Sequence, residues 1–271
     1  MNERADVVGS LGQAFQPLCF VTGASGYVGR ALVPELVQAC ERVQGRCIAH
    51  VRPDSPHLAS RRDEFQALGV HTDSTPWDPE SMASRLAEMS PSHVFHLVGS
   101  TRARAAQEGI QDPYDTIDRA LFAMLLGALA PLSPAPRVIY LSSRGASASS
   151  TSAYLQTRFR CEELLRASGL PFTIARPGLI TGPDRKPARR GEALAALALR
   201  PAAGLLRALG LGGPASRLRP FDAGEIAYGL VHAGFNYTTI GRVLAGDELR
   251  FEQTKDREWS GPASRRDGLR H

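Results

Sequence analysis

A tyrosine and an arginine four residues apart form the clearest pattern for proton-transfer chemistry in this chain. Tyr154 and Arg158 lie in a segment with helical periodicity, and this spacing places both side chains on one helix face. A cation beside a phenol stabilises the phenolate, which a tyrosine acting as general acid and base at neutral pH requires. Ser142 and Ser143 end an apolar segment upstream and offer hydroxyls to a carbonyl. We expect these residues to be catalytic, with the choice between the serines open because neighbouring strand residues point to opposite faces.

A glycine-rich turn near the start of the chain predicts a binding site for a dinucleotide. Three glycines with the spacing Gly-x-x-Gly-x-x-Gly follow an apolar segment and precede a helical one. Such a turn lets the backbone approach a pyrophosphate, and the N–H groups of the following helix face the anion. The residues expected to hold the cofactor here are Gly23, Ser25, Gly26, Tyr27, Val28 and Gly29.

The ends of three further apolar segments extend the predicted cofactor site. Arg52 ends the second segment, where a guanidinium suits the 2′-phosphate of NADP, whereas Asp54 would favour NAD. We expect NADP(H) in preference to NAD(H). Asp78 ends the third segment and either meets the adenine amino group or caps the following helix. Gly99 and Ser100 end the fourth segment, where the missing side chain lets a cofactor pass close to the backbone, unless the two residues form an ordinary turn.

Apolar segments of strand length alternate with helical patterns over most of the chain. Strands are expected at 18–22, 46–51, 70–77, 93–98, 138–142 and 172–176, and helices at 28–43, 56–67, 79–89, 114–129 and 153–168. Short apolar strands separated by helices form a parallel sheet covered on both faces. Right-handed crossovers then give an α/β fold with a doubly wound parallel sheet.

The pattern changes after residue 178, and this change divides the chain. We expect a flexible extension at 1–16, a dinucleotide-binding core at 17–178, a C-terminal substrate-side segment at 179–253 and a charged mobile tail at 254–271. The substrate-side segment completes the same domain. It contains a loop at 179–192, a helix near 192–209 and a second helix with Asp222 as its N-cap.

Composition excludes several classes of protein. The 271 residues are 43% hydrophobic and 22% charged, which is typical of a globular protein. The net charge of +5 comes mostly from arginine, but no segment interleaves basic and aromatic residues, so we expect no nucleic-acid partner. We expect neither a secretory signal nor a membrane span, because the longest apolar candidate, 120–132, is too short. The predicted location is therefore the cytoplasm.

The cysteines and histidines give no metal-binding pattern. None of the four cysteines forms a Cys-x-x-Cys pair, and they are expected to be buried thiols in a reducing compartment. His93 and His96 are three apart on a predicted strand, so they point to opposite faces and cannot share a metal. No metal site is predicted.

Together, these motifs resemble the short-chain dehydrogenase/reductase superfamily in its extended or atypical branch. The glycine turn, the serine pair and Tyr154-x-x-x-Arg158 carry the likeness, with the segment 168–178 that ends in Arg-Pro-Gly. More closely, the chain resembles the oxidoreductase-like HIV-Tat-interactive protein family over about residues 17–235. The residues that carry this closer likeness lie in 99–105, 142–146, 154–156, 176–178, 184–185 and 190–192.

The resemblance implies an NADPH-binding Rossmann-like fold and a specific set of roles. The tyrosine donates and accepts the proton, the serine orients the carbonyl, and the turn formed by Arg176, Pro177 and Gly178 lies beside the nicotinamide. The family places a lysine four residues after the tyrosine to hold the nicotinamide ribose. This chain has Arg158 there, which keeps the charge but has a planar and longer fork of donors.

Three functions are compatible with these patterns. The first is an NADP-dependent oxidoreductase that reduces a small carbonyl substrate with Tyr154 as proton donor. The second is an NADPH-binding regulatory or scaffold protein with a protein partner and weak or no catalysis, which the lysine-to-arginine departure favours. The third is an enzyme similar to nucleotide-sugar epimerases and dehydratases. The substrate and the choice between monomer and homodimer are not predicted.

Overall fold

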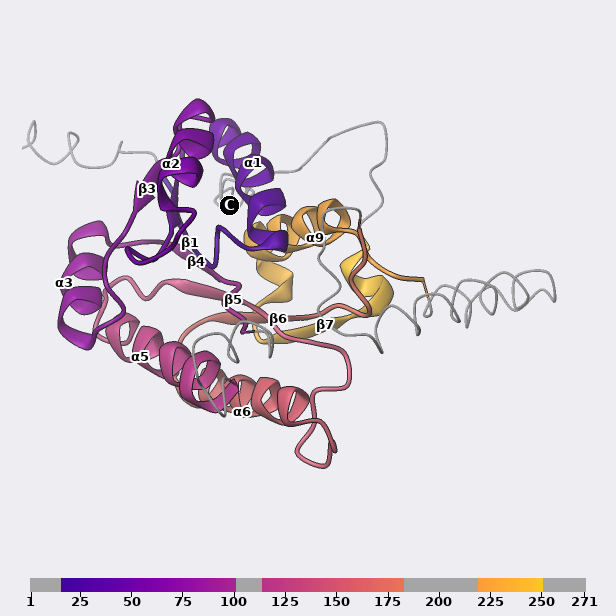
Figure 1. The fold of residues 1–271 in the computed structure, drawn as a ribbon. Coiled ribbons are helices and arrows are strands. Elements are labelled where there is room, and N and C mark those ends of the chain that lie inside the picture. The colour runs from indigo at the N-terminus through magenta and orange to yellow at the C-terminus, as the bar shows by residue number, and fades with distance from the viewer. Residues whose placement is uncertain (1–15, 101–113, 183–218, 251–271) are drawn as a thin grey trace, which may run out of the picture.

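Seven parallel strands form the centre of the computed structural model, which describes residues 16–100, 114–182 and 219–250 (Figure 1). The strands lie in the order β3-β2-β1-β4-β5-β6-β7, and every neighbouring pair is parallel. Their bounds are β1 Leu18–Thr22, β2 Arg46–His50, β3 His71–Asp73, β4 His93–His96, β5 Arg137–Leu141, β6 Phe172–Arg176 and β7 Arg242–Ala245. The predicted α/β doubly wound parallel sheet is confirmed.

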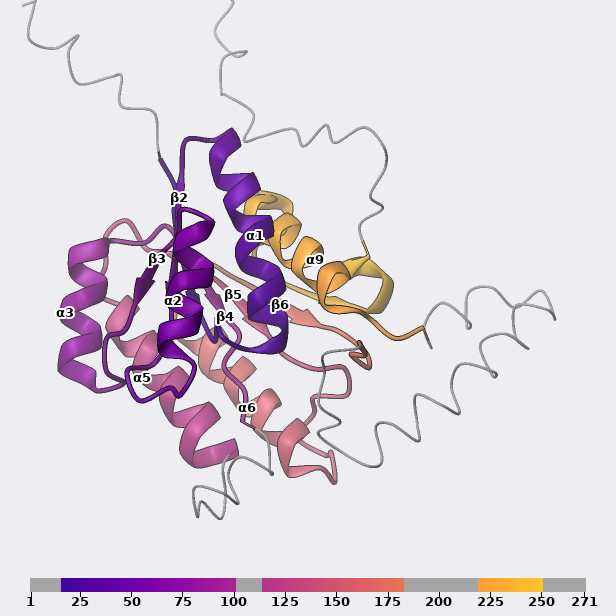
Figure 2. The ribbon, with the colours of Figure 1, turned by 45° about the horizontal axis from the view of Figure 1, so that its top comes forward.

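Helices cover both faces of this sheet, as Figures 1 and 2 show. One layer consists of α1 (Tyr27–Arg42), α2 (Leu58–Ala67) and α9 (Ala223–Phe235), and the other of α3 (Pro79–Met89), α5 (Ala120–Leu129) and α6 (Ala153–Ala167). A π-helical turn, η1 (Tyr114–Arg119), leads into α5, and two short 3-10 turns, η2 (Tyr237–Thr239) and η3 (Gly246–Leu249), flank β7.

The core has two halves, one on each side of the sheet. In β1, Cys19 and Val21 pack into the half beneath α1 and α9, whereas Phe20 packs into the half beneath α3 and α5. In β5, Ile139 and Tyr140 divide in the same way. Because both faces are covered, the strands read as continuous apolar runs rather than alternating ones.

The predicted element bounds agree closely with the structure, with two differences. The strand expected at 70–77 is only the three-residue β3, since the chain leaves the sheet after Asp73. The strand β7 was not predicted, because it has four residues of which only Leu244 is buried. The helix expected near 192–209 lies outside the described residues.

The C-terminal segment adds to both the sheet and the helical layer. Asp222 is the N-cap of α9, as predicted, and forms a reciprocal capping box with Glu225. Helix α9 packs along α1, and β7 pairs with β6. The division of the chain into extension, core, substrate-side segment and tail stays a prediction. In the part of the chain that the structure describes, no helix has the length and apolar character needed to cross a membrane.

Candidate functional site

The glycine turn lies at the point where the strand order reverses. It follows β1, which has β2 on one side and β4 on the other. Open α/β sheets bind ligands at the carboxyl ends of the strands next to such a reversal. The topology therefore places the predicted dinucleotide site at the expected position of this fold.

Close packing requires glycine at two positions of this turn. Gly23 has φ +77°, and a β-carbon there would lie 2.8 Å from the carbonyl carbon of Leu97, just after β4. A β-carbon on Gly29 would lie 2.3 Å from the Gly23 oxygen. The Gly26 N–H donates to the same oxygen at 3.0 Å. These contacts hold the start of α1 directly against the end of β1.

The first turn of α1 suits an anion. Its N-cap, Gly26, has no side chain to bond the free N–H groups, and the first turn contains no acidic residue. A helix N-terminus of this kind carries partial positive charge and fits a pyrophosphate. The side chain of Val28 is buried, so its expected contribution is the backbone N–H, and Ser25 lies half-buried in the turn. The Tyr27 hydroxyl donates to the Thr181 oxygen at 3.3 Å, which connects the turn to the segment after Gly178.

Arg158 is turned into the protein rather than toward solvent. Its Nη1 donates to the oxygens of Val98 (3.1 Å) and Leu141 (3.3 Å) and to the Tyr140 hydroxyl (3.1 Å). Its Nη2 pairs with Asp118 at 3.2 Å, and the Arg158 side chain is only 6% exposed. Burial opposes the charge, but two tyrosines and Asp118 hold the pKa of Arg158 well above its usual value.

Gly99 is explained by this arginine. A β-carbon at position 99 would lie 2.3 Å from Arg158 Nη2. The Ser100 N–H donates to Asp118 at 2.7 Å, so the segment that follows β4 is tied to the same carboxylate. Gly99 and Ser100 were predicted to contact the cofactor. The structure gives them a second role, which is to accommodate and fix the buried ion pair.

Tyr154 is held between Arg158 and a second tyrosine. The Arg158 guanidinium carbon lies 5.1 Å from the centre of the Tyr154 ring. The ring of Tyr114 meets it edge-on, with 5.5 Å between ring centres. The predicted one-face arrangement of Tyr154 and Arg158 is thus present, with a cation beside the aromatic ring.

The next residue on this helix face, Glu162, was missed by the sequence reasoning. It is fully buried and accepts from Ser142 Oγ at 2.5 Å, Arg176 Nε at 2.8 Å and Arg166 Nη2 at 3.1 Å. Glu162 therefore fastens α6 to the ends of β5 and β6. Its position four residues after Arg158, on the same face, was the available signal.

The two serines differ in their surroundings. Ser142 is 3% exposed and directed at Glu162, whereas Ser143 is half-buried and its hydroxyl donates to the Arg144 oxygen at 3.4 Å. Of the two predicted serines, Ser143 is the accessible one. In the Arg-Pro-Gly turn, Arg176 is paired with Glu162, and the Pro177 oxygen accepts from the Arg144 N–H at 2.9 Å.

The structure also places the two residues expected near the adenosine end. Arg52 pairs with Asp54 at 2.9 Å and stays 31% exposed after β2. Asp78 is the N-cap of α3 and accepts from the Ser81 N–H at 2.8 Å. The capping alternative for Asp78 is therefore present, and its contact with adenine stays a prediction.

His93, His96 and the four cysteines are buried in the core. His93 stacks on Phe235 on one side of the sheet, and His96 stacks on Phe122 on the other, so the predicted opposite orientation is confirmed. Burial lowers the pKa of His93 to about 4 and that of His96 to about 3. The four cysteines are buried and unpaired by disulfides. Within the described ranges, no group of three or more histidine, cysteine or acidic residues could hold a metal.

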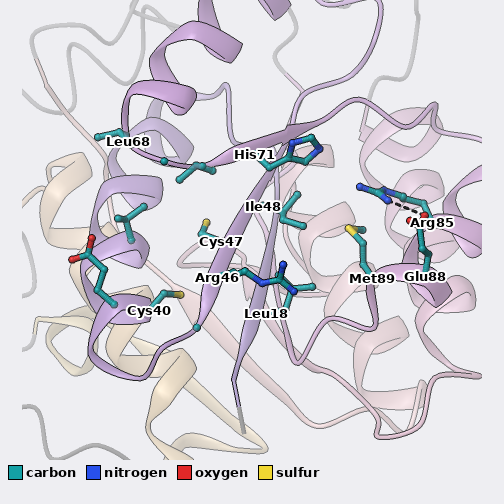
Figure 3. Close-up of a pocket in the computed structure, with 15 residues that line it drawn as sticks. Leu18, Cys40, Arg46, Cys47, Ile48, Leu68, His71, Arg85, Glu88 and Met89 are labelled. Atoms are coloured by element: carbon teal, nitrogen blue, oxygen red, sulfur yellow. Dashed lines mark hydrogen bonds and ion pairs between the residues drawn. The ribbon is translucent and has the colours of Figure 1, made fainter. Parts of the chain in front are cut away.

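A cavity of about 530 Å³ lies at the opposite ends of the strands (Figure 3). Leu18 and Arg46 at the amino ends of β1 and β2 line it, with Cys47 and Arg85. None of the predicted site residues is among its lining. It is therefore separate from the site at the carboxyl ends.

Residues 19–233 match the model of the NAD dependent epimerase/dehydratase family. A protein named fmp52, mitochondrial, from Aspergillus niger is 28% identical over 227 residues, which cover 83% of this chain and 90% of that protein. The crystal structure of a putative epimerase from Burkholderia cenocepacia has a TM-score of 0.59 at 22% identity, covering 86% of this chain and 76% of that one. The UDP-glucuronic acid 4-epimerase of Bacillus cereus, solved with NAD and UDP-glucuronic acid, has a TM-score of 0.56 at 17% identity, covering 84% and 77%.

The fold and the site define an extended short-chain dehydrogenase/reductase with a nicotinamide-dinucleotide site. More narrowly, the chain belongs to the NAD dependent epimerase/dehydratase family. The resemblance to the superfamily is thereby confirmed. The closer likeness to the HIV-Tat-interactive family stays a prediction, as does the cytoplasmic location.

Proposed function

We propose that this protein is an NADP(H)-dependent reductase of a small carbonyl compound, with Tyr154 as its proton donor. The observation that carries the proposal is that the glycine turn and the Tyr154–Arg158 pair both contact Val98. The turn glycine Gly23 lies against the Val98 nitrogen, and Arg158, beside the Tyr154 ring, bonds the Val98 oxygen. The dinucleotide cradle and the candidate acid are therefore adjacent.

The chain's own residues supply proton transfer and orientation. Tyr154 donates a proton to the carbonyl oxygen, and Ser143 is the accessible hydroxyl that orients this oxygen. The guanidinium of Arg158, 5.1 Å from the centre of the Tyr154 ring, holds this ring in place. A reduced nicotinamide, when bound, supplies the hydride.

Arg158 supports Tyr154 from inside the protein. Both of its Nη atoms donate to protein groups, so we assign Arg158 to holding the tyrosine and the strand ends rather than the cofactor ribose. Its Nε is buried without an acceptor among the described residues. This orphaned donor supports the presence of a bound molecule or ordered water beside the site.

The preference for NADP(H) rests on Arg52. Its exposed guanidinium follows β2, where the ribose of a dinucleotide lies in this fold. Its side chain keeps 31% exposure beside Asp54, and a guanidinium suits the geometry of a 2′-phosphate.

Loss of the phenol tests the proposed reaction. Tyr154→Phe is expected to slow carbonyl reduction by about 10²–10⁴-fold while the dissociation constant for NADPH stays unchanged. Tyr237→Phe is the matched control, because that ring is 56% exposed on η2. Turnover of Tyr154→Phe at the wild-type rate would refute this mechanism. NADPH binding without turnover of any carbonyl would instead support the regulatory or scaffold alternative.

A nucleotide-sugar epimerase or dehydratase is the second candidate, because family membership and the Bacillus cereus epimerase favour it. A UDP-sugar incubated with the chain and NAD would distinguish the two functions. An epimerase would form the isomeric UDP-sugar without net change in NADH absorbance. A reductase would leave the UDP-sugar unchanged and, when given NADPH and a small carbonyl compound instead, would consume the reduced cofactor in proportion to its product.

A further inference from the structure

Three of the four cysteines gather beneath α1, near the amino ends of the strands. Cys19 on β1 and Cys47 on β2 are register partners on neighbouring parallel strands, and Cys40 lies in the last turn of α1. All three side chains pack in the core half beneath α1. The sulfurs of Cys40 and Cys19 are 3.8 Å apart, within the hydrogen-bond distance of two thiols. This pair belongs to neither the glycine turn nor the tyrosine site.

The two sulfurs of this pair differ in their access to the cavity at the amino ends of the strands. Cys40 lines the cavity, whereas Cys19 is fully buried and is not among its lining. Figure 3 shows Cys40 on α1 and Cys47 on β2 at the wall of the cavity. The cavity volume of about 530 Å³ is many times that of a water molecule. A small solute in the cavity therefore meets Cys40 first, with Cys19 behind it.

The two sulfurs also differ in acidity. The hydrogen bond with Cys19 lowers the pKa of Cys40 and outweighs both burial and the nearby charge of Glu41. The same hydrogen bond, together with burial, raises the pKa of Cys19 well above its usual value. The thiolate rather than the thiol is the nucleophile in sulfur oxidation. Cys40 is therefore suited to react first, and Cys19 is placed to react second.

We propose that Cys40 and Cys19 form a dithiol site that hydroperoxides oxidise to a disulfide between α1 and β1. The Cys40 thiolate attacks one peroxide oxygen, the O–O bond breaks, and the sulfur becomes a sulfenic acid as hydroxide or alkoxide leaves. The Cys19 sulfur then attacks the Cys40 sulfur, the S–S bond forms and the S–O bond breaks. The Cys19 proton leaves with the hydroxyl group as water. The two sulfurs together lose two electrons, the peroxide gains them, and a thiol reductant reverses the change.

The proposed disulfide closes a loop around the dinucleotide turn. Positions 19 and 40 lie on β1 and α1, and the segment between them contains all three turn glycines. A crosslink of this kind restricts the unfolded chain, so oxidation is expected to raise the thermal unfolding midpoint by several degrees. The proposal uses neither Tyr154 nor NADPH, so it is independent of the proposed reductase function.

Peptide mapping of the full chain tests the proposal directly. Cleavage by trypsin places the four cysteines in separate peptides, 5–30, 31–42, 47–61 and 161–166. The protein is treated with hydrogen peroxide, alkylated under denaturing conditions, digested and analysed by mass spectrometry. We expect peptides 5–30 and 31–42 to be joined with the loss of two hydrogens, and Cys161 to stay alkylated. Cys161 is the matched control, because it is equally buried but lies on the other side of the sheet.

Substitutions separate the first sulfur from the second. In Cys19→Ser the sulfenic acid of Cys40 has no thiol to attack it, so dimedone should label Cys40 at least about tenfold more than in the wild type. Cys19→Ala repeats this measurement without a buried hydroxyl if the serine variant fails to fold. Cys47→Ser should form the disulfide as fast as the wild type, because burial raises the pKa of Cys47 and keeps it a thiol.

Several results would overturn the proposal. These are a disulfide between Cys40 and Cys47 as the main product, oxidation of Cys161 as fast as that of Cys40, and equal dimedone labelling of Cys40 in the wild type and the Cys19 variants. Oxidation should raise the unfolding midpoint of the wild type but not that of Cys19→Ser. Equal midpoints for the reduced and oxidised wild type would overturn the stabilising role of the crosslink.

Discussion

The guanidinium of Arg158 occupies the space that any side chain at Gly99 would need, because a β-carbon there would lie 2.3 Å from Nη2. The guanidinium cannot easily withdraw, since Nη2 is paired with Asp118 and Nη1 bonds three further oxygens. The residue at position 99 is therefore determined by the arginine that replaces the family's lysine.

This relationship predicts coupling between the two positions. Gly99→Ala is expected to lower the free energy of unfolding by about 1–3 kcal/mol, the usual cost of overpacking. In an Arg158→Lys background the same change should cost at least about 1 kcal/mol less, because the shorter amine leaves room. Denaturant titration of the four proteins measures this coupling.

Gly127→Ala is the control for this cycle. Gly127 lies inside α5, and nothing lies within 4 Å of a β-carbon there, so alanine should be neutral or stabilising. Equal costs at positions 99 and 127, or strictly additive effects of Gly99→Ala and Arg158→Lys, would contradict the packing described.

Replacing Glu162, which is not one of the proposed reacting groups, is expected to lower the free energy of unfolding strongly. Glu162→Gln removes the carboxylate that pairs with Arg176 and leaves that guanidinium without its counter-charge. The free energy of unfolding should therefore fall by about 3–5 kcal/mol. Glu163→Gln is the matched control, because Glu163 is 56% exposed and pairs with Arg166 at the surface. Similar unfolding midpoints for the two variants would show that Glu162 does not fasten the helix.

The buried histidines predict a loss of stability in acid. Burial lowers the pKa of His96 to about 3, far below the ordinary value of 6.5, so the unfolded chain binds a proton that the folded chain refuses. The stabilisation is complete above about pH 6.5 and falls by about 1.4 kcal/mol per pH unit as the pH drops through this window toward 3.

Removal of His96 should flatten this dependence. Between pH 6.5 and 4.5, the unfolding free energy of the wild type should therefore fall more steeply than that of His96→Phe. His57→Gln, at an exposed position, should leave the slope unchanged. A wild-type slope in His96→Phe would show that this histidine already accepts a proton in the folded state.

Arg52 predicts cofactor preference. Arg52→Ala should weaken NADPH binding about 10–100-fold and leave NADH binding nearly unchanged, since only NADPH carries a 2′-phosphate for a charge-assisted contact. Arg62→Ala, on the exposed side of α2, controls for general loss of positive charge. Fluorescence titration of the wild type and the two variants with both cofactors gives the six constants, and tighter binding of NADH than NADPH by the wild type would refute this preference.

The sequence predicted the sheet well because its strands are buried on both faces. β1 and β6 coincide with the expected bounds, and the glycine turn was recognisable because each local signal agreed with the fold. β7 could not be predicted, since pairing with β6 rather than its own apolar content makes it a strand.

The site was predictable only as a set of residue types. The spacing of Tyr154 and Arg158 gave the shared helix face, but not the direction of the guanidinium, which depends on Asp118 forty positions earlier. The burial of Ser142 likewise depends on Glu162, twenty positions away. Such long-range polar contacts leave no local periodicity in the chain.

The most direct test of the central claim is a single-turnover reaction of NADPH-loaded protein with carbonyl substrates, followed by the loss of NADPH absorbance. The unmodified chain should oxidise its bound NADPH in one exponential phase. Tyr154→Phe should bind NADPH equally well but react about 10²–10⁴-fold more slowly, which is the usual contribution of a general acid. Equal rates for the two proteins would contradict the assignment of Tyr154 as the proton donor.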